Sequence, residues 1–156
     1  MKTDIIIDYL ADHPDLLAVL ASWFYAEWGH SKPDFTTQFF EDELRGRMNR
    51  DQLPLTLVAF LNDNPVATVS LLLEEMETHP QFLHWLGSVY TLPDYRHHGI
   101  GSQLLEHAAS EAKRLGVRQL YLWTRHVESL YARFGWVVIQ RPVYRGRPVA
   151  IMRRSL

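Results

Sequence analysis

The sequence contains no cysteine among its 156 residues. A disulfide framework and a protein thiol nucleophile are therefore excluded, and any thiol chemistry has to come from a ligand. No apolar run reaches the length that crosses a bilayer, and the start, Met1-Lys2-Thr3-Asp4, becomes acidic too early for a secretory signal. We therefore expect a cytoplasmic protein without a membrane partner.

An excess of positive charge is also missing, because the formal net charge is −2 at pH 7. Proteins that bind nucleic acids usually carry a basic face, so no nucleic-acid partner is expected. The chain has eight histidines. However, the adjacent His97 and His98 cannot readily point to one centre, and no tight ligand spacing joins them to His84, so no metal site is expected. The length predicts a single domain spanning residues 1–156.

The most informative stretch is a strand, a loop with two glycines and a helix in direct succession. Residues Val89, Tyr90 and Thr91 close a predicted strand, and the segment Arg96-His97-His98-Gly99-Ile100-Gly101-Ser102 leads into a helix whose apolar positions follow a 3.6-residue period. Backbone N–H groups at a helix N-terminus lack intrahelical partners, and glycines let a phosphate approach them closely. The sequence therefore predicts an anion site here.

The segment after this helix decides between two folds that use such a loop. Residues Val117 to Trp123 are strand-like, which indicates a β-loop-α-β crossover between parallel strands. A dinucleotide-binding fold needs a third glycine three residues after Gly101, where this chain has Leu104. A dinucleotide site is thus excluded, and a nucleotide-binding regulator is disfavoured.

The rest of the chain alternates short apolar runs with turn residues. The expected strands are Ile5 to Leu10, Leu55 to Leu61, Val66 to Leu73, Phe82 to Thr91, Trp136 to Gln140 and Val149 to Arg153. The expected helices are Asp15 to Trp28 and Phe35 to Met48, with Thr36 and Thr37 weakening the start of the second. The sum is an α/β fold with a mixed sheet, antiparallel in its N-terminal strands and parallel at its centre, and helices on both faces.

Two motifs resemble a known family. The pattern Arg96-x-x-Gly99-x-Gly101 is similar to the Gln/Arg-x-x-Gly-x-Gly/Ala signature of the Gcn5-related N-acetyltransferases, the GNAT superfamily. Downstream, Leu130-Tyr131 followed by Gly135-Trp136 resembles the second landmark of that family. The resemblance implies a GNAT-like twisted sheet, with a splay between the strand that ends at Thr91 and the strand that ends near Trp123.

The resemblance also implies acetyl-CoA as the cosubstrate, without a metal. The amides of Val89, Tyr90 and Thr91 would hydrogen-bond the pantetheine arm and polarise the thioester carbonyl. The pyrophosphate would be held by the loop, whose residues are Arg96, His97, His98, Gly99, Ile100, Gly101 and Ser102.

By the same resemblance, Tyr131 is the general acid that assists departure of the coenzyme A thiolate. Tyrosine has a pKa of about 10 and a thiol about 8.5, so its expected work is hydrogen-bond stabilisation of developing negative charge. An amine with a lysine-like pKa of about 10.4 needs about 4.6 kcal/mol to lose its proton at pH 7, so a base or a water chain is required. Glu75 is the first candidate for the base; Glu74, His84 and water remain open.

The expected acceptor is a small cationic amine such as a polyamine, an amino acid or an aminoglycoside. The protein is slightly acidic, and an aromatic group can line the acceptor pocket: Tyr25, Trp28, His30 and Phe35. Without cysteine, the amine has to attack the thioester directly in a ternary complex. The alternative is a non-catalytic acyl-CoA-binding or sensing module on the same fold. The exposed C-terminal strands offer a surface for a homodimer.

Overall fold

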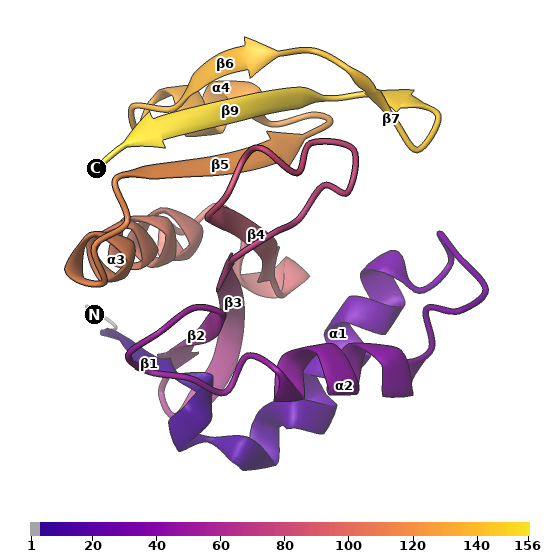
Figure 1. Ribbon diagram of the computed structural model, residues 1–156. Coiled ribbons are helices and arrows are strands. Elements are labelled where there is room, and N and C mark those ends of the chain that lie inside the picture. The colour runs from indigo at the N-terminus through magenta and orange to yellow at the C-terminus, as the bar shows by residue number, and fades with distance from the viewer. Residues whose placement is uncertain (1–3) are drawn as a thin grey trace.

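The computed structural model describes residues 4–156, which build a seven-stranded mixed sheet with helices on both faces (Figure 1). The strand order is β1-β2-β3-β4-β5-β9-β6. All neighbours in the sheet are antiparallel except β4 and β5. The strands are β1 (Ile5–Tyr9), β2 (Leu55–Leu61), β3 (Asn64–Leu72), β4 (Trp85–Thr91), β5 (Gln119–Thr124), β6 (Val137–Gln140) and β9 (Ala150–Ser155), and a separate hairpin is made by β7 (Val143–Tyr144) and β8 (Arg147–Pro148).

Alternation along the strands distributes apolar side chains to two cores, one on each face. On one face, Leu57 and Ala59 of β2 pack in a cluster with α3 (Ile100–Arg114) and with Tyr131 of α4 (Glu128–Ala132). On the other face, Val58 and Phe60 pack with α1 (Leu17–Trp28) and α2 (Thr37–Arg45). The period of two in a strand thus sends successive residues to opposite layers. The predicted α/β fold is confirmed.

Strands β4 and β5 part almost as soon as they meet. Among residues 4–156, their register contains the single pair Trp85 and Tyr121. Strand β4 also carries a bulge, because Thr68 is paired with Tyr90 and Ser70 with Gly87, which leaves one extra residue in β4. Ser88, inside the bulge, has a φ of 50°. The splay implied by the family resemblance is therefore present. After Trp85, the edge of β4 that faces β5 has no described strand paired to it.

The strand expected from Phe82 and the helix expected from Asp15 both begin later in the structure. Residues Phe82 to His84 are not part of a strand, because His84 has a φ of 73° and its N–H donates back to the carbonyl of Leu73 over 3.0 Å. The first helix is preceded by a 3-10 turn at Pro14–Leu16 and begins at Leu17.

The start of α2 differs from the expectation for a physical reason. Thr36 is its N-cap, and the Thr36 side-chain oxygen accepts a hydrogen bond from the N–H of Phe39 over 3.0 Å. A threonine that was expected to weaken this helix therefore satisfies one of the unpaired donors of its first turn. The helix is also shorter than expected and ends at Arg45.

Loss of this cap is expected to destabilise the protein. The Thr36→Ala variant should have a free energy of unfolding lower by about 1 kcal/mol, measured by urea denaturation, because the N–H of Phe39 loses its partner. Thr37→Ala is the matched control, since the exposed Thr37 begins the helix without capping it. Equal effects of the two variants would contradict the capping role.

Candidate active site

The N-terminus of α3 presents a run of backbone donors without acceptors. The first hydrogen bond of the helix runs from the N–H of Gln103 to the carbonyl of Gly99 over 3.1 Å. Within residues 4–156, none of the amides from His97 to Ser102 donates a hydrogen bond to a protein acceptor. His97 and Gly99 have φ values of 66° and 80°, and such left-handed residues turn successive N–H groups toward one concavity. This geometry suits a diphosphate.

The two glycines of the loop have different reasons to be glycine. Gly99 has a φ of 80°, a conformation that other residues adopt only with strain. Gly101 has ordinary helical geometry, and a Cβ placed there would meet only the Oγ1 of Thr91, at 3.8 Å. The protein itself thus leaves room for a side chain at Gly101. The family signature has glycine or alanine at this position, and such a small residue keeps the neighbouring amides accessible, so the loop fits a diphosphate.

The free edge of β4 lies next to this loop in the sequence and is partly held by Arg96. The N–H of Leu92 donates to the carbonyl of Val66 in β3 over 2.9 Å. Alternation along an antiparallel strand therefore turns Tyr90 toward β3 and turns Val89 and Thr91 toward the open edge. The Nε of Arg96 donates to the carbonyl of Thr91 over 2.8 Å, and its guanidinium lies 5.5 Å from the ring centre of Tyr90.

Tyr131 has a buried ring and a hydroxyl that reaches solvent. The residue is 7% exposed and its ring meets that of Trp136 edge-on at 6.2 Å. Its hydroxyl has no hydrogen-bond partner within residues 4–156, although no fully buried side-chain N or O atom in this part of the chain lacks one. The hydroxyl is therefore not fully enclosed. Burial raises the pKa of Tyr131 to about 12, so the group stays protonated at neutral pH.

The Glu75 carboxylate lies where β4 and β5 begin to part. Two residues beyond the pair Trp85 and Tyr121 come Gly87 and Trp123, and the Oε2 of Glu75 is 2.8 Å from the point where a Cβ of Gly87 would stand. Burial raises the pKa of the Glu75 carboxyl, and the Arg47 and Arg145 charges and the Trp123 side chain oppose that rise. Glu75 thus sits in a half-buried position beside the splay.

The other candidates for a base are placed differently. Glu74 is exposed, and His84 precedes β4, four residues before the bulge at Ser88. At about 3.3 Å of rise per strand residue, His84 lies on the order of 13 Å along the chain from Ser88. The structure therefore brings Glu75 rather than His84 to the bulge.

Of the aromatic residues expected around the acceptor, all within residues 4–156, the structure brings only Trp28 into ring contact with a residue of β4. The ring of Trp28 lies 6.3 Å from that of Tyr90 on β4, so α1 reaches the strand beside the splay. Phe35 stacks on Phe39 at 4.7 Å and belongs to the core around α2. Tyr25 contacts His30 and is 40% exposed.

Sequence reasoning missed two residues on this side of the sheet. The ring of Trp23 lies 5.8 Å from that of Tyr90, which places a second α1 tryptophan beside β4. The Arg47 guanidinium reaches Ser70 and Ser88 across the sheet. The sequence signals only that Ser70 needs a hydrogen-bond partner, because Ser70 is a hydroxyl residue within a strongly apolar strand run, and it does not indicate Arg47 as that partner.

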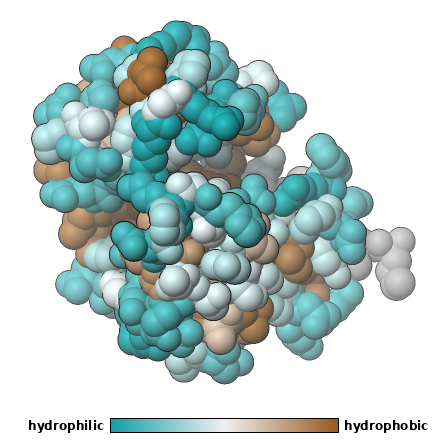
Figure 2. Space-filling view, turned by 90° about the vertical axis from the view of Figure 1, so that its right-hand side faces the viewer, coloured by the Kyte–Doolittle hydropathy of each residue, from teal (hydrophilic) through white to brown (hydrophobic). Residues whose placement is uncertain are grey.

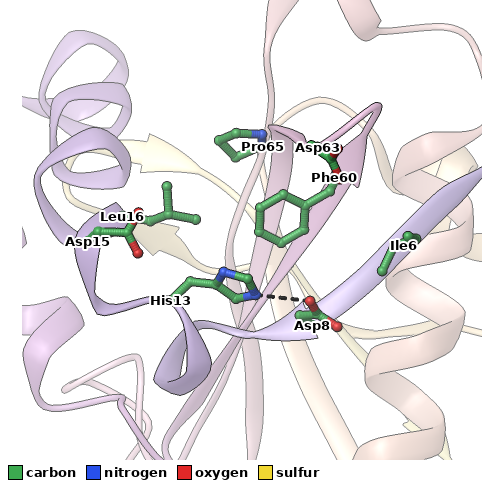
Figure 3. Close-up of a pocket in the computed structure, with 8 residues that line it drawn as sticks. All are labelled: Ile6, Asp8, His13, Asp15, Leu16, Phe60, Asp63 and Pro65. Atoms are coloured by element: carbon green, nitrogen blue, oxygen red, sulfur yellow. Dashed lines mark hydrogen bonds and ion pairs between the residues drawn. The ribbon is translucent and has the colours of Figure 1, made fainter.

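Two surface pockets lie outside the loop. One, of about 290 Å³, is lined by residues of β1, the β2–β3 hairpin and the 3-10 turn before α1, and contains the hydrogen bond between His13 and Asp8 at 2.9 Å (Figure 3). It opens at the β1 side of the sheet, three strands from β4. The other, of about 410 Å³, is lined by Glu74 to Glu77, His79, Pro80 and Phe82. Only the second pocket includes a predicted site residue, Glu75.

The surface between the two ends of the sheet is hollowed. Figure 2 views the molecule from the right-hand side of Figure 1 and shows a mostly hydrophilic surface with a recess in which hydrophobic residues are visible.

No group of three or more His, Cys, Asp or Glu residues within residues 4–156 is arranged to hold a metal ion. In the same part of the chain, no helix has both the length and the apolar character that a bilayer crossing requires.

Comparison with known proteins assigns a family to this arrangement. The sequence matches the family described as "Acetyltransferase (GNAT) family" over residues 14–136. The chain belongs to this family. The matched region contains the loop, the β4 edge, Glu75 and Tyr131. The expectation of a GNAT acetyltransferase, taken from Arg96-x-x-Gly99-x-Gly101 and Leu130-Tyr131, is thus confirmed. No curated protein matches the chain in sequence.

Solved structures of acetyltransferases share the fold. An aminoglycoside 6'-acetyltransferase type Ii is 19% identical with a TM-score of 0.76, and 96% of each chain is covered. An aminoglycoside 6'-N-acetyltransferase complexed with coenzyme A is 16% identical with a TM-score of 0.75, again over 96% of each chain. The PaiA N-acetyltransferase from Thermoplasma acidophilum, in complex with coenzyme A, is 22% identical with a TM-score of 0.67 over 100% of each chain.

Substitution of Gly101 should separate stability from binding in this acetyltransferase. Gly101→Val should keep the free energy of unfolding within about 1 kcal/mol, because the protein leaves space for a Cβ at this position and valine is a better helix former than glycine. Its side chain is larger than the alanine that the family signature allows and would crowd the loop amides, so the affinity for coenzyme A should fall about tenfold or more, measured by calorimetry.

Ser102→Ala is the control, because this change leaves the backbone amide in place. Its affinity for coenzyme A should stay within about threefold of wild type, since the expected contact is made by the main chain. A similar loss in both variants, or no loss in Gly101→Val, would contradict the assignment of the loop as a diphosphate site.

Proposed function

We propose that this protein transfers the acetyl group of acetyl-CoA to the amine of a small cationic molecule, by direct attack of the amine in a ternary complex. One observation carries the proposal: six adjacent amides without acceptors, from His97 to Ser102, follow directly after a strand whose edge is open. Coenzyme A has a diphosphate for the first feature and an amide-containing arm for the second. Family membership supports the same reading.

The backbone would bind and orient the cosubstrate. In this proposal, the amides of the loop hold the diphosphate with help from the α3 dipole. The groups of Val89 and Thr91 that face the open edge hydrogen-bond the arm and the thioester carbonyl. The predicted contact at Tyr90 would then come from its side chain or from neighbouring backbone, since its amide faces β3. Acetyl-CoA supplies the activated acyl group and the leaving thiolate.

Tyr131 is the proposed donor to the leaving sulfur. Its pKa of about 12 lies above that of a free thiol, at about 8.5, so complete proton transfer from Tyr131 to a free thiolate is uphill. The hydroxyl instead donates a hydrogen bond as charge develops on the sulfur. A hydroxyl without a protein partner is available for this bond.

Glu75 is the proposed base. Its raised pKa brings the carboxyl closer to the range where a base accepts a proton effectively near neutral pH. Its place between Gly87 and Trp123 puts the carboxylate at the mouth of the splay, where the amine has to meet the thioester. Water can carry the proton over any remaining distance.

The pocket that contains Glu75 favours a cationic acceptor, because Glu74 and Glu77 line it as well, alongside the Arg47 and Arg145 charges that also act on Glu75. Trp23 and Trp28 offer aromatic faces beside Tyr90. Two structures of similar fold are described as aminoglycoside acetyltransferases. A cytoplasmic location, and a homodimer through the C-terminal strands, stay predictions.

A direct assay tests the proposal. Purified protein is mixed with acetyl-CoA and a panel of polyamines, amino acids and aminoglycosides, and free thiol release above the hydrolysis rate is measured. Release with at least one cationic amine is the expected result. Binding of acetyl-CoA without release for any amine would favour the alternative, a sensing module on the same fold.

Removal of the Tyr131 hydroxyl should affect turnover and not binding. Tyr131→Phe should lower kcat roughly 10- to 1000-fold, with acetyl-CoA affinity within about threefold of wild type. Because the Tyr131 pKa is about 12, the wild-type rate should not decline through this group below pH 10. Tyr121→Phe, whose hydroxyl binds only the Gln119 side chain, is the control. Unchanged kcat in Tyr131→Phe would remove Tyr131 from this role.

Removal of the Glu75 charge should change the pH profile as well as the rate. Wild-type log(kcat/KM) should be level between the pKa of Glu75 and that of the amine, and should fall with a slope of about one below the Glu75 pKa, because the Glu75 carboxylate has to be ionised to take the ammonium proton. Burial raises the Glu75 pKa, so this fall should set in at a higher pH than for an ordinary glutamate. Glu75→Gln should lose the level region, because the amine must then release its proton to water, and its kcat should be about 100-fold lower.

Glu74→Gln is the matched control, since Glu74 is the exposed neighbour of Glu75. It should keep the level region of the wild-type pH profile and most of the rate. If Glu74→Gln loses the level region and Glu75→Gln keeps it, the base is Glu74 instead.

A further inference from the structure

Arg47 lies just after α2 and crosses to the bulge of β4. Its side chain is 12% exposed, whereas that of Arg45, two residues earlier, is 54% exposed. The Nη1 of Arg47 donates to the Oγ of Ser70 over 3.1 Å and to the Oγ of Ser88 over 3.0 Å. A buried guanidinium with two hydroxyl partners is costly to place unless its contacts hold something in position.

The contact with Ser88 falls on a strained residue. Ser88 has a φ of 50°, which non-glycine residues adopt only when the surroundings fix them. Ser70 lies opposite Gly87 in the register, on the neighbouring strand. Its hydroxyl also meets that of Thr56 in β2 at 2.8 Å. The hydroxyls of Thr56 in β2, Ser70 in β3 and Ser88 in β4 thus lie side by side across the sheet, and Arg47 bonds to the last two.

The bulge determines what the next residues of β4 present. One extra residue at Ser88 shifts the register, so that Tyr90 pairs with Thr68 and the backbone groups of Val89 and Thr91 face the open edge. Without the bulge, a one-residue change of register would reverse the side to which each of these residues points. The direction of Val89 and Thr91 therefore depends on the conformation of Ser88.

We propose that Arg47 is a positioning residue for acetyl transfer: its guanidinium fixes the Ser88 bulge, and through it the β4 edge that presents the thioester. The proposal rests on the proposed function for its kinetic consequence. Arg47 also connects the segment after α2 to β4, and the Nη2 of Arg47 lies 3.6 Å from Glu43 of α2. The position of α2 is thereby coupled to the β4 edge.

The experiment compares Arg47→Met with Arg45→Met. Both changes remove an arginine at the end of α2, but Arg45 bonds only Glu41 and Asp42 on the surface. Arg47→Met should lower kcat about 10- to 100-fold, with coenzyme A affinity within about threefold of wild type because the diphosphate loop is untouched. Arg45→Met should change neither quantity by more than about twofold.

A double-mutant cycle with Ser88→Ala tests whether Arg47 acts through the bulge. If it does, the Arg47→Met/Ser88→Ala variant should be no slower than Arg47→Met alone by more than about twofold. Multiplying effects of the two substitutions would overturn the proposal, as would a kcat for Arg47→Met equal to that of Arg45→Met.

Amide hydrogen exchange in the free protein supplies a readout that does not need turnover. The Tyr90 amide, which faces β3, should exchange at least about tenfold faster in Arg47→Met and unchanged in Arg45→Met. An inactive wild-type protein would count against the proposed function, while the exchange result would still decide the role of Arg47. Unchanged exchange at Tyr90 would overturn that role, and Arg47→Lys provides a folded variant if Arg47→Met is unstable.

Discussion

The structure depends on backbone groups of β4 that no strand can pair. Sheets normally satisfy the N–H and C=O groups of every interior strand, and an unpaired group away from water costs free energy. Here β4 is interior in strand order but loses its β5 partner after Trp85 and Tyr121. The residues of the resulting edge are half-buried, and Thr91 lies next to Gly101 at a helix N-terminus with free amides. A ligand with acceptors and donors along its length can satisfy both.

Two ionisable side chains near this edge are shifted in the same direction by the same cause. Burial raises the pKa of both Tyr131 and Glu75. For a hydroxyl, the shift preserves a hydrogen-bond donor, and for a carboxyl it increases basicity. Burial thus shifts both groups in the directions that the proposed function requires, and the Arg47 and Arg145 charges limit the rise of the Glu75 pKa.

The sequence revealed the features that are local and missed those that join distant segments. The Gly99 and Gly101 loop, the α3 periodicity and the hairpin of β2 and β3 are encoded within short windows, and the structure contains all three. The contact of Arg47 with Ser88 joins residues 41 positions apart, so no local periodicity or motif could predict it. The start of β4 was missed because the apolar residues Phe82 and Leu83 look strand-like, while a positive φ at His84 has no sequence signal.

The parting of β4 and β5 has a mechanical consequence. Across the middle of the sheet, one registered pair, Trp85 and Tyr121, joins the four N-terminal strands to β5, β9 and β6 within residues 4–156. Every other pair of neighbouring strands in the described sheet is joined by several registered residue pairs. Parting of the two sheet halves at that junction would break fewer hydrogen bonds between strands than parting at any other boundary of the described sheet, so side-chain packing across the two halves provides most of the resistance to such a movement.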